Sequence, residues 1–279
     1  MRERGFATTI VAVIAVPAAL AQTPQTLSGN VTLVGDYRFR GLSQTYTQPA
    51  IQGGIDYTPT AGGRGGVYVG AWGSNVSGNQ FLNGGSLELD LYGGYRWTGG
   101  GGKVGLDLGV LYYWYPRARY NINPGDRYNT AEVFLGARYD QFTVKYSHAL
   151  TNLFGMKTST IGGYCGIDAD GTAATTNCLG SGASNGSGYI DLTATFNVPL
   201  GASLALHYGH QSVRSYDQLS YADYKIGFTR AFGGTTLGAA WVGTDAEGRF
   251  YRFTPTTGGS SETENVGRSA VVLSASRVF

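Results

Sequence analysis

Ionisable side chains recur at every second position in several segments of this 279-residue chain. Between Ser86 and Trp97, for example, Glu88, Asp90 and Arg96 alternate with leucine, glycine and aromatic residues. Side chains of an extended strand point alternately to its two faces, so the charges share one face and the apolar residues share the other. Charges this frequent are tolerable facing water or one another and are costly facing lipid. The charged face is therefore predicted to line an aqueous interior.

The same pattern in other segments extends the set of candidate pore-lining residues. They are Asp36, Arg38, Arg40, Asp56, Glu88, Asp90, Arg96, Lys103, Asp107, Glu132, Arg138, Lys145, Asp191, Asp223 and Lys225. Two interpretations stay open: an open pore with a transverse field between opposite charges, or a plugged barrel whose charges pair internally. Because the signs are mixed, strong cation or anion selectivity is not predicted.

The two cysteines, Cys165 and Cys178, lie in one long polar stretch from Thr151 to Gly188, with no histidine nearby. In an exported chain a disulfide is the default interpretation, ahead of free thiols and of a metal site. Residues 168–171 read Asp-Ala-Asp-Gly, like the start of a calcium loop, but no glutamate follows at the required end. A solvated turn is expected there, and neither metal nor cofactor is predicted.

A Ser/His arrangement would give a different chemistry. His148 and His210 fall on apolar faces near strand ends, and serines are plentiful, so an interfacial enzyme resembling the outer-membrane phospholipases is one alternative. The other interpretation is that both histidines are amphipathic residues at a membrane interface. No G-x-S-x-G nucleophile elbow between a predicted strand and a predicted helix occurs, and no H-E-x-x-H helix. We therefore predict that the chain is not an enzyme.

About twelve segments carry the alternating pattern and must position these residues. They are predicted as strands near 30–40, 51–58, 66–75, 86–97, 103–114, 131–139, 142–148, 189–198, 204–210, 222–229, 237–241 and 269–279. Many approach the ~9–11 residues that a tilted strand needs to cross a bilayer. The 45 glycines and 20 tyrosines favour strands and turns, and mean hydropathy is −0.12, as expected for alternating segments. The net charge of +2 gives no reason to expect nucleic acid.

Alternation alone also fits a soluble ligand-binding barrel, in which the apolar face points inward and the polar face outward. The lengths of the connections are needed to distinguish the two barrels. Turns are mostly short at Pro59 to Gly65, Thr98 to Gly102, Asp140-Gln141, Pro199 to Ala202 and Gly233-Gly234. The intervening connections are longer, at Gly41 to Gln48, Asn75 to Gly85, Pro116 to Asn129, Thr151 to Gly188, Val213 to Ser220 and Asp245 to Gly267. An even strand number with short periplasmic turns and long extracellular loops is typical of outer-membrane barrels.

Both ends of the chain carry export signals. Residues 1–21 combine Arg2 and Arg4, an apolar run, Pro17 and a final Ala-Leu-Ala, which is the pattern of a cleaved secretory signal peptide. The alternative, an uncleaved anchor, would need the ~20 apolar residues of a spanning helix. Residues 22–279 are predicted to form the barrel. A terminal Phe279 closing an alternating strand looks like the signal by which outer-membrane barrels are recognised for assembly, although Arg277 departs from that pattern.

Four motifs in order carry a family resemblance. They are residues 40–45 (RGLSQT), 49–57 (PAIQGGIDY), 70–76 (GAWGSNV) and 88–95 (ELDLYGGY). This stretch, roughly residues 36–97, resembles the TorF family of predicted outer-membrane porins of Gram-negative bacteria. The resemblance implies a location and an architecture and leaves the substrate open. The glycine-rich insert at 61–66 and the cysteine-bearing loop depart from the family, so loop-borne selectivity is not transferred.

The sequence thus predicts an all-β chain: a transmembrane, antiparallel, up-and-down β-barrel of about twelve strands in the bacterial outer membrane. The expected function is a weakly selective channel for passive diffusion of small hydrophilic solutes. A non-conducting adhesin or structural barrel is the alternative, followed by the phospholipase-like enzyme. Expected partners are outer-membrane lipid, the barrel-assembly machinery through the C-terminal strand, and the solutes, with no nucleic acid.

Overall fold

The wall of the molecule is built from twelve strands. The computed structural model describes residues 27–59, 64–82, 84–120, 125–255 and 263–279, so the predicted signal peptide lies outside the described residues. The wall strands are β1 (Leu27–Val34), β4 (Ala50–Tyr57), β5 (Gly65–Asn75), β6 (Leu87–Gly99), β7 (Val104–Trp114), β8 (Thr130–Tyr139), β9 (Phe142–Ala149), β10 (Gly188–Val198), β11 (Ala202–Ser212), β12 (Tyr221–Phe232), β13 (Thr235–Thr244) and β16 (Ala270–Val278).

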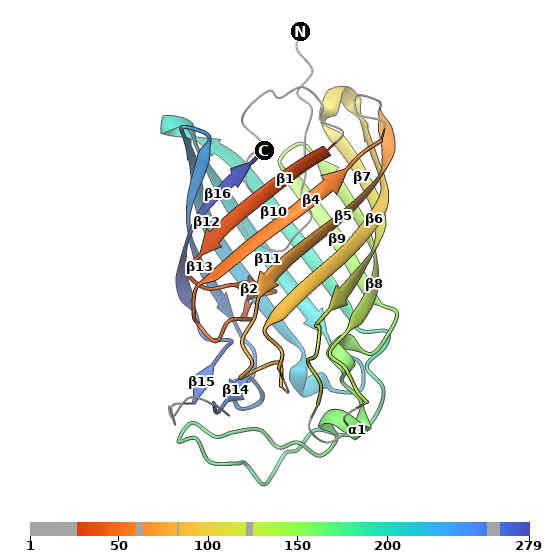
Figure 1. The fold of residues 1–279 in the computed structure, drawn as a ribbon, viewed down its shortest axis with the longest axis vertical. Coiled ribbons are helices and arrows are strands. Elements are labelled where there is room, and N and C mark those ends of the chain that lie inside the picture. The colour runs from red at the N-terminus through yellow and green to blue at the C-terminus, as the bar shows by residue number, and fades with distance from the viewer. Residues whose placement is uncertain (1–26, 60–63, 83, 121–124, 256–262) are drawn as a thin grey trace.

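These strands form one closed antiparallel barrel in which each strand pairs with its neighbours along the chain (Figure 1). Closure is made by β1, where Val31 lies opposite Gly53 of β4 on one side and opposite Arg277 of β16 on the other. A closed ring leaves no unpaired sheet edge. The predicted up-and-down barrel of twelve strands is confirmed.

The two ends of the barrel differ. Connections of two to seven residues lie at the end where β16 finishes, which we call the short-turn end; part of one, residues 60–63, is outside the described residues. Longer connections lie at the opposite, long-loop end, with α1 (Thr158–Ile161), β14 (Arg252–Phe253) and β15 (Glu264–Asn265) (Figure 1). No helix among the described residues is long and apolar enough to cross a membrane.

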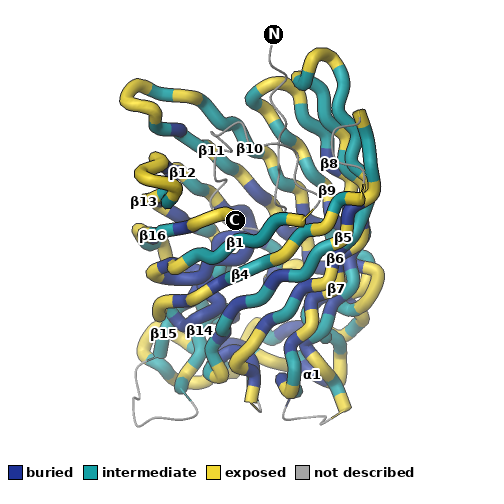
Figure 2. The backbone as a smooth tube through the Cα atoms, turned by 45° about the horizontal axis from the view of Figure 1, so that its top comes forward, coloured by how far each residue is buried: buried dark blue, intermediate teal, exposed yellow. Residues whose placement is uncertain are grey.

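The wall has an apolar outer face and a polar inner face. Leu108 on the outside is 54% exposed, and Leu33, Val67, Leu135 and Leu273 are similarly exposed. The residues that alternate with these along each strand face the interior. Exposed and buried positions therefore alternate along many strands (Figure 2). A water-soluble barrel would bury its apolar face instead. The predicted orientation of the alternating pattern is therefore confirmed.

The first predicted strand, 30–40, is wrong beyond Val34. There the chain leaves the wall, and residues 35–49, which we call the inward segment, fold into the barrel and form the hairpin of β2 (Arg38–Phe39) and β3 (Leu42–Ser43) (Figure 1). The hairpin turns at Arg40 and Gly41, both of which have positive φ. Polar atoms of this segment find partners within the segment, on the inner wall and in the loop before β16, which allows them to be buried.

Strands β6 and β7 approach closely at a pair of glycines. Gly94 lies opposite Gly109, and a Cβ added to Gly94 would press on the carbonyl oxygen of Leu108 and lie 2.8 Å from the Tyr68 hydroxyl. At Gly227 of β12 the nearest atom would be the Cβ of Ala240 at 3.5 Å, an ordinary contact. The space for a methyl group therefore differs between two inner-wall glycines.

We predict that Gly94→Ala lowers the free energy of unfolding by about 1–3 kcal/mol, because a side chain there forces the two strands apart. Gly227→Ala is the matched control and should change it by less than about 1 kcal/mol. Urea titration of the refolded barrel, followed by tryptophan fluorescence, measures both. Equal effects of the two substitutions would contradict the close approach.

Candidate functional site: the barrel lumen

Arg40 joins the inward segment to three wall strands. Its guanidinium donates from Nη2 to both carboxylate oxygens of Glu132, at 2.9 and 2.7 Å, and from Nη1 to Oε1 of Gln211 at 2.6 Å. The guanidinium also lies 4.3 Å above the ring of Tyr189. Both charges of the Arg40–Glu132 pair are buried, so each depends on the other for solvation. This pair anchors the segment across the lumen.

Asp36 and Arg38 form a second buried pair at 2.6 Å, within the inward segment itself. Ser43 donates its hydroxyl to Asp36, and Arg38 donates to the backbone carbonyls of Val266 and Arg268 in the loop before β16, at 3.2 and 2.7 Å. Asp36, Arg38 and Arg40 were predicted on the barrel wall. The structure instead places them on the chain that fills the lumen.

Around the inward segment, the long-loop half of the lumen is packed like a protein core. Glu88 of β6 is fully buried and accepts a hydrogen bond from the Tyr115 hydroxyl at 2.9 Å, and Asp90 beside it is 4% exposed. Aromatic rings fill the space between charges: Tyr37 meets Trp72, and Phe39 meets both Tyr113 and Phe154. In this conformation, buried groups occupy the half of the lumen near the long loops.

The short-turn half is more accessible. On one wall, Arg96 of β6 lies 3.2 Å from Asp107 of β7 and stacks on Tyr68, whose hydroxyl donates to Asp107 at 2.7 Å. Asp56 accepts a hydrogen bond from the Tyr92 hydroxyl at 2.8 Å. The side chains of the Arg96–Asp107 pair are 28% and 15% exposed. These charges therefore line a hydrated part of the lumen.

Another part of the wall carries a histidine between carboxylates. His207 of β11 lies 2.9 Å from Asp223 through Nε2 and 3.4 Å from Asp191 through Nδ1. Next to this cluster, Lys225 lies directly opposite His207 on β12, and Lys145 of β9 lies 4.5 Å above the Phe134 ring. Both lysines are partly accessible. Positive and negative groups are thus mixed on this wall too.

Two predicted positions lie at the short-turn end. Arg138 of β8 donates to the carbonyls of Gly102 and Asp140, at 2.7 and 3.3 Å, and so braces the adjoining turns. Lys103, which was predicted on the lumen wall, lies exposed in the turn before β7, because the strand begins only at Val104. Lys103 is therefore not a residue of the lumen wall.

Sequence reasoning missed several lumen residues. His207 could have been found, since it alternates with Leu206 and Tyr208 and shares the inner face of β11 with Gln211. Tyr37 and Phe39 alternate with Asp36, Arg38 and Arg40, which puts them on the outer face of the predicted strand 30–40, but they are buried in the lumen. No local signal distinguishes them, because the period-two pattern continues after the chain has left the wall.

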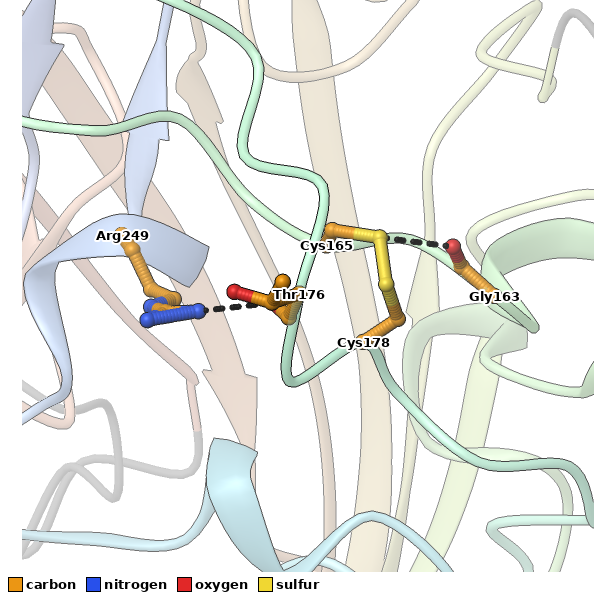
Figure 3. The surroundings of a disulfide bond; sticks show 5 residues. All are labelled: Gly163, Cys165, Thr176, Cys178 and Arg249. Atoms are coloured by element: carbon orange, nitrogen blue, oxygen red, sulfur yellow. Dashed lines mark hydrogen bonds between the residues drawn. A yellow bond between two sulfur atoms is a disulfide. The ribbon is translucent and has the colours of Figure 1, made fainter.

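The long-loop end carries the cysteines. Cys165 and Cys178 are joined by a disulfide in the loop between β9 and β10, and Arg249 donates to the carbonyl of Thr176 at 3.0 Å (Figure 3). Nearby, the hydrogen bond from the Lys157 ammonium holds the pKa of Asp126 below its ordinary value. Charge pairing and covalent cross-linking therefore both order this end.

Neither a metal site nor a Ser/His pair is assembled by the described residues. No three His, Cys, Asp or Glu side chains in the described ranges are grouped to hold a metal ion, and Asp170 instead caps a turn by accepting from Thr172. His148 lies 3.4 Å from the hydroxyl of Tyr146, and His210 is exposed on the outer face. No serine hydroxyl in the described part of the chain hydrogen-bonds a histidine.

Phe279 ends the chain beside β1. Its backbone N–H donates to the Gly29 carbonyl at 2.8 Å, and the Gly29 N–H returns a bond at 3.2 Å. The phenyl ring is exposed at the short-turn end. Backbone pairing between the first and last strands of the barrel thus continues to the last residue, and the Phe279 side chain stays exposed.

A family model described as "Bacterial protein of unknown function (Gcw_chp)" matches residues 18–279. The chain belongs to this family. No curated protein matches this member of the family.

Solved structures are similar to the chain at low sequence identity. One comes from a study of the mechanism behind in-meso crystallization of membrane proteins; it is 9% identical, with 91% of this chain and 83% of that chain covered and a TM-score of 0.52. The COG4313 outer membrane channel from Pseudomonas putida F1 is 14% identical, with 96% and 100% covered and a TM-score of 0.47. The NanC porin is 9% identical, with 90% and 98% covered and a TM-score of 0.48. The first of these similarities shows a shared fold alone.

We predict that Arg40→Ala lowers the free energy of unfolding by about 3–5 kcal/mol, because Glu132 would be left buried without its partner. Arg96→Ala breaks a more exposed pair and should cost about 0–1 kcal/mol. Urea unfolding of the two variants beside the wild type provides the comparison. A smaller loss for Arg40→Ala than for Arg96→Ala would show that the buried pair is not an anchor.

Proposed function

We propose that the chain is a porin-like channel of the bacterial outer membrane for passive diffusion of small hydrophilic solutes. The observation that carries the proposal is the combination of an apolar outer face with a charged, partly accessible inner face in the short-turn half. Such a barrel can stand in lipid while keeping water inside. Diffusion along a polar lumen needs no catalytic residue.

The outer membrane is the location that best fits the exterior of the barrel. Outward leucines and valines would face the hydrocarbon, and tyrosines and tryptophans such as Tyr95, Tyr139 and Trp241 also lie on this face. The long loops would then be extracellular and the short turns periplasmic, with residues 1–21 as the cleaved export signal. The TorF-like motifs of residues 36–97 agree with this narrower assignment.

The accessible charges would set how solutes pass. Asp56, Arg96 and Asp107 line the hydrated half along β4, β6 and β7, and Lys145, Asp191 and Lys225 line it along β9, β10 and β12. Mixed signs favour weak charge selectivity. Because the inward segment fills the extracellular half, solutes would cross when that segment moves from the position seen here. The segment would thus act as the constriction.

Two further partners follow from the same proposal. Lipid would contact the apolar exterior, and the barrel-assembly machinery would recognise the C-terminal strand with its exposed Phe279. Phe279 keeps its backbone bonds to Gly29 while its ring stays accessible. This arrangement is compatible with recognition of the side chain.

The packed extracellular half favours a second candidate, a non-conducting barrel with a structural or adhesive role. Arg40, Glu132, Asp36 and Arg38 are all buried and paired, as expected for a permanent plug. The two candidates differ in whether the inward segment moves. Conductance measurements separate them.

We expect discrete single-channel steps from the refolded mature protein in a planar bilayer. The double substitution Arg40→Ala/Glu132→Ala removes both charges of the anchor, so it should raise the open fraction severalfold. Arg96→Ala/Asp107→Ala, the matched control, removes a neutral pair from the hydrated half and should leave the open fraction unchanged, and the reversal potential nearly unchanged because the net charge of the lumen stays the same. Silence from the folded wild type and from both double variants would favour the non-conducting barrel.

Two substitutions on the opposite faces of β10 test the membrane location. Leu192 faces outward near the middle of β10, and Thr195 faces inward. In lipid vesicles Leu192→Arg should lower the free energy of unfolding by about 2–4 kcal/mol, because the charge would enter hydrocarbon. Thr195→Arg, the matched control, should cost about 1 kcal/mol or less, because it faces the lumen. Similar costs at both positions would argue against a lipid-facing exterior.

A further inference from the structure

The disulfide closes an arm that has little regular structure of its own. Residues 163–180 leave the loop after α1 and return beside it, with Cys165 and Cys178 joined near the base. Close to the bond, the Leu179 N–H donates to the Tyr164 carbonyl at 2.8 Å. Between the cysteines the chain forms turns, bends and one isolated antiparallel bridge, from Ile167 to Ala173, with no longer strand and no helix. The disulfide adds a covalent constraint to an arm that a few backbone hydrogen bonds otherwise hold.

The arm reaches across to the loop between β13 and β16. The N–H of Ile167 donates to the carbonyl of Arg249 at 2.8 Å. In return Arg249 donates to the carbonyl of Thr176 at 3.0 Å, and Arg252 donates to the carbonyl of Ile167 at 3.2 Å. Figure 3 shows Arg249 approaching the arm opposite the disulfide. These hydrogen bonds connect the loop between β13 and β16 to both halves of the cross-linked arm, at Ile167 in the first half and at Thr176 in the second.

The same loop holds the inward segment. The Ser43 N–H donates to the Val266 carbonyl at 2.9 Å, and Arg38 donates to the carbonyls of Val266 and Arg268. Tyr46 donates its hydroxyl to the Phe253 carbonyl at 2.6 Å. Within the loop the Val266 N–H donates to the Tyr251 carbonyl at 3.0 Å. A series of hydrogen bonds thus runs from the disulfide arm through residues 249–253 and 264–268 to the chain that fills the lumen.

We propose that the Cys165–Cys178 disulfide is a redox-sensitive clasp on the inward segment. While the bond is intact, the arm keeps the backbone of Ile167 and Thr176 in place, and the neighbouring loop holds Ser43 and Arg38. A dithiol breaks the S–S bond, leaving two cysteine thiols, and is itself oxidised to a cyclic disulfide. The freed arm gains conformational entropy, so its contacts to the loop open more often.

The clasp acts together with other anchors. Arg40 still binds Glu132, and Gln80 still donates to the Ser43 carbonyl at 2.6 Å when the disulfide is broken. Reduction therefore raises the fraction of time that the inward segment is released without unfolding the barrel. That such release increases conductance rests on the proposed channel function.

Hydrogen exchange followed by mass spectrometry measures the release directly. The full-length mature barrel is refolded with the bond formed and exchanged with and without dithiothreitol. Peptides covering residues 35–49 should exchange at least about tenfold faster after reduction, because exchange reports local opening. The double substitution Cys165→Ser/Cys178→Ser should show the fast exchange without any reductant. Peptides from β6 and β7 should not change.

Two further variants test the route. Arg249→Ala keeps the disulfide and loses the bond to Thr176 together with the partly exposed pair to Glu247, so it should also speed exchange of residues 35–49. Thr172→Ala lies in the same arm and loses only its side-chain bond to Asp170, so it serves as the matched control with wild-type exchange. Unchanged exchange of residues 35–49 on reduction overturns the clasp, as does equal acceleration in β6 and β7.

Conductance recorded on the same samples separates the clasp from the channel. Faster exchange of residues 35–49 together with a higher open fraction of the channel supports both the clasp and the channel function. Faster exchange from a barrel that remains silent supports the clasp and counts against the channel. A conducting barrel whose inward segment exchanges equally slowly in both redox states refutes the clasp and leaves the channel standing.

Discussion

Ring closure is the constraint on which the rest of the structure depends. Strand β1 must pair with β4 and β16 at once, or the sheet is left with two open edges. Once the ring is closed, each wall residue has only an outside or an inside to face. The alternating sequence then sends leucine and valine outward and charge inward. Loop placement follows, because antiparallel neighbours return the chain to alternate ends.

Closure creates a second problem, since a polar inner face must be hydrated or filled. This chain does both at different depths. Near the short turns the Arg96–Asp107 pair stays partly exposed, whereas near the long loops the Arg40–Glu132 pair is buried. The difference comes from residues 35–49, which carry their own charges to meet those of the wall. Filling by a charged segment avoids leaving Glu132 desolvated and alone.

The sequence predicted the wall well because period two is a local property. Strand β7 was predicted at 103–114 and is observed at Val104–Trp114. The inward segment was missed because Asp36, Arg38 and Arg40 continue the same alternation after Val34, and only distant partners, such as those of Arg40 on β8 and β11, show that the chain has turned inside. Those partners lie 92 and 171 residues from Arg40, beyond any local pattern. His207 was overlooked although its alternation marked it.

The chemistry of the filling bears on whether it can move. An apolar filling of the same volume would be at least as stable as buried ion pairs, because it avoids desolvating charge. On opening, however, an apolar segment would expose its surface to water, whereas Arg38, Arg40 and Glu132 would regain hydration. The charged segment therefore narrows the free-energy difference between the filled and hydrated lumen. When the free-energy difference between the filled and the hydrated lumen is small, a few contacts in the long loops, such as those of Arg249 and Val266, are strong enough to shift the equilibrium between them.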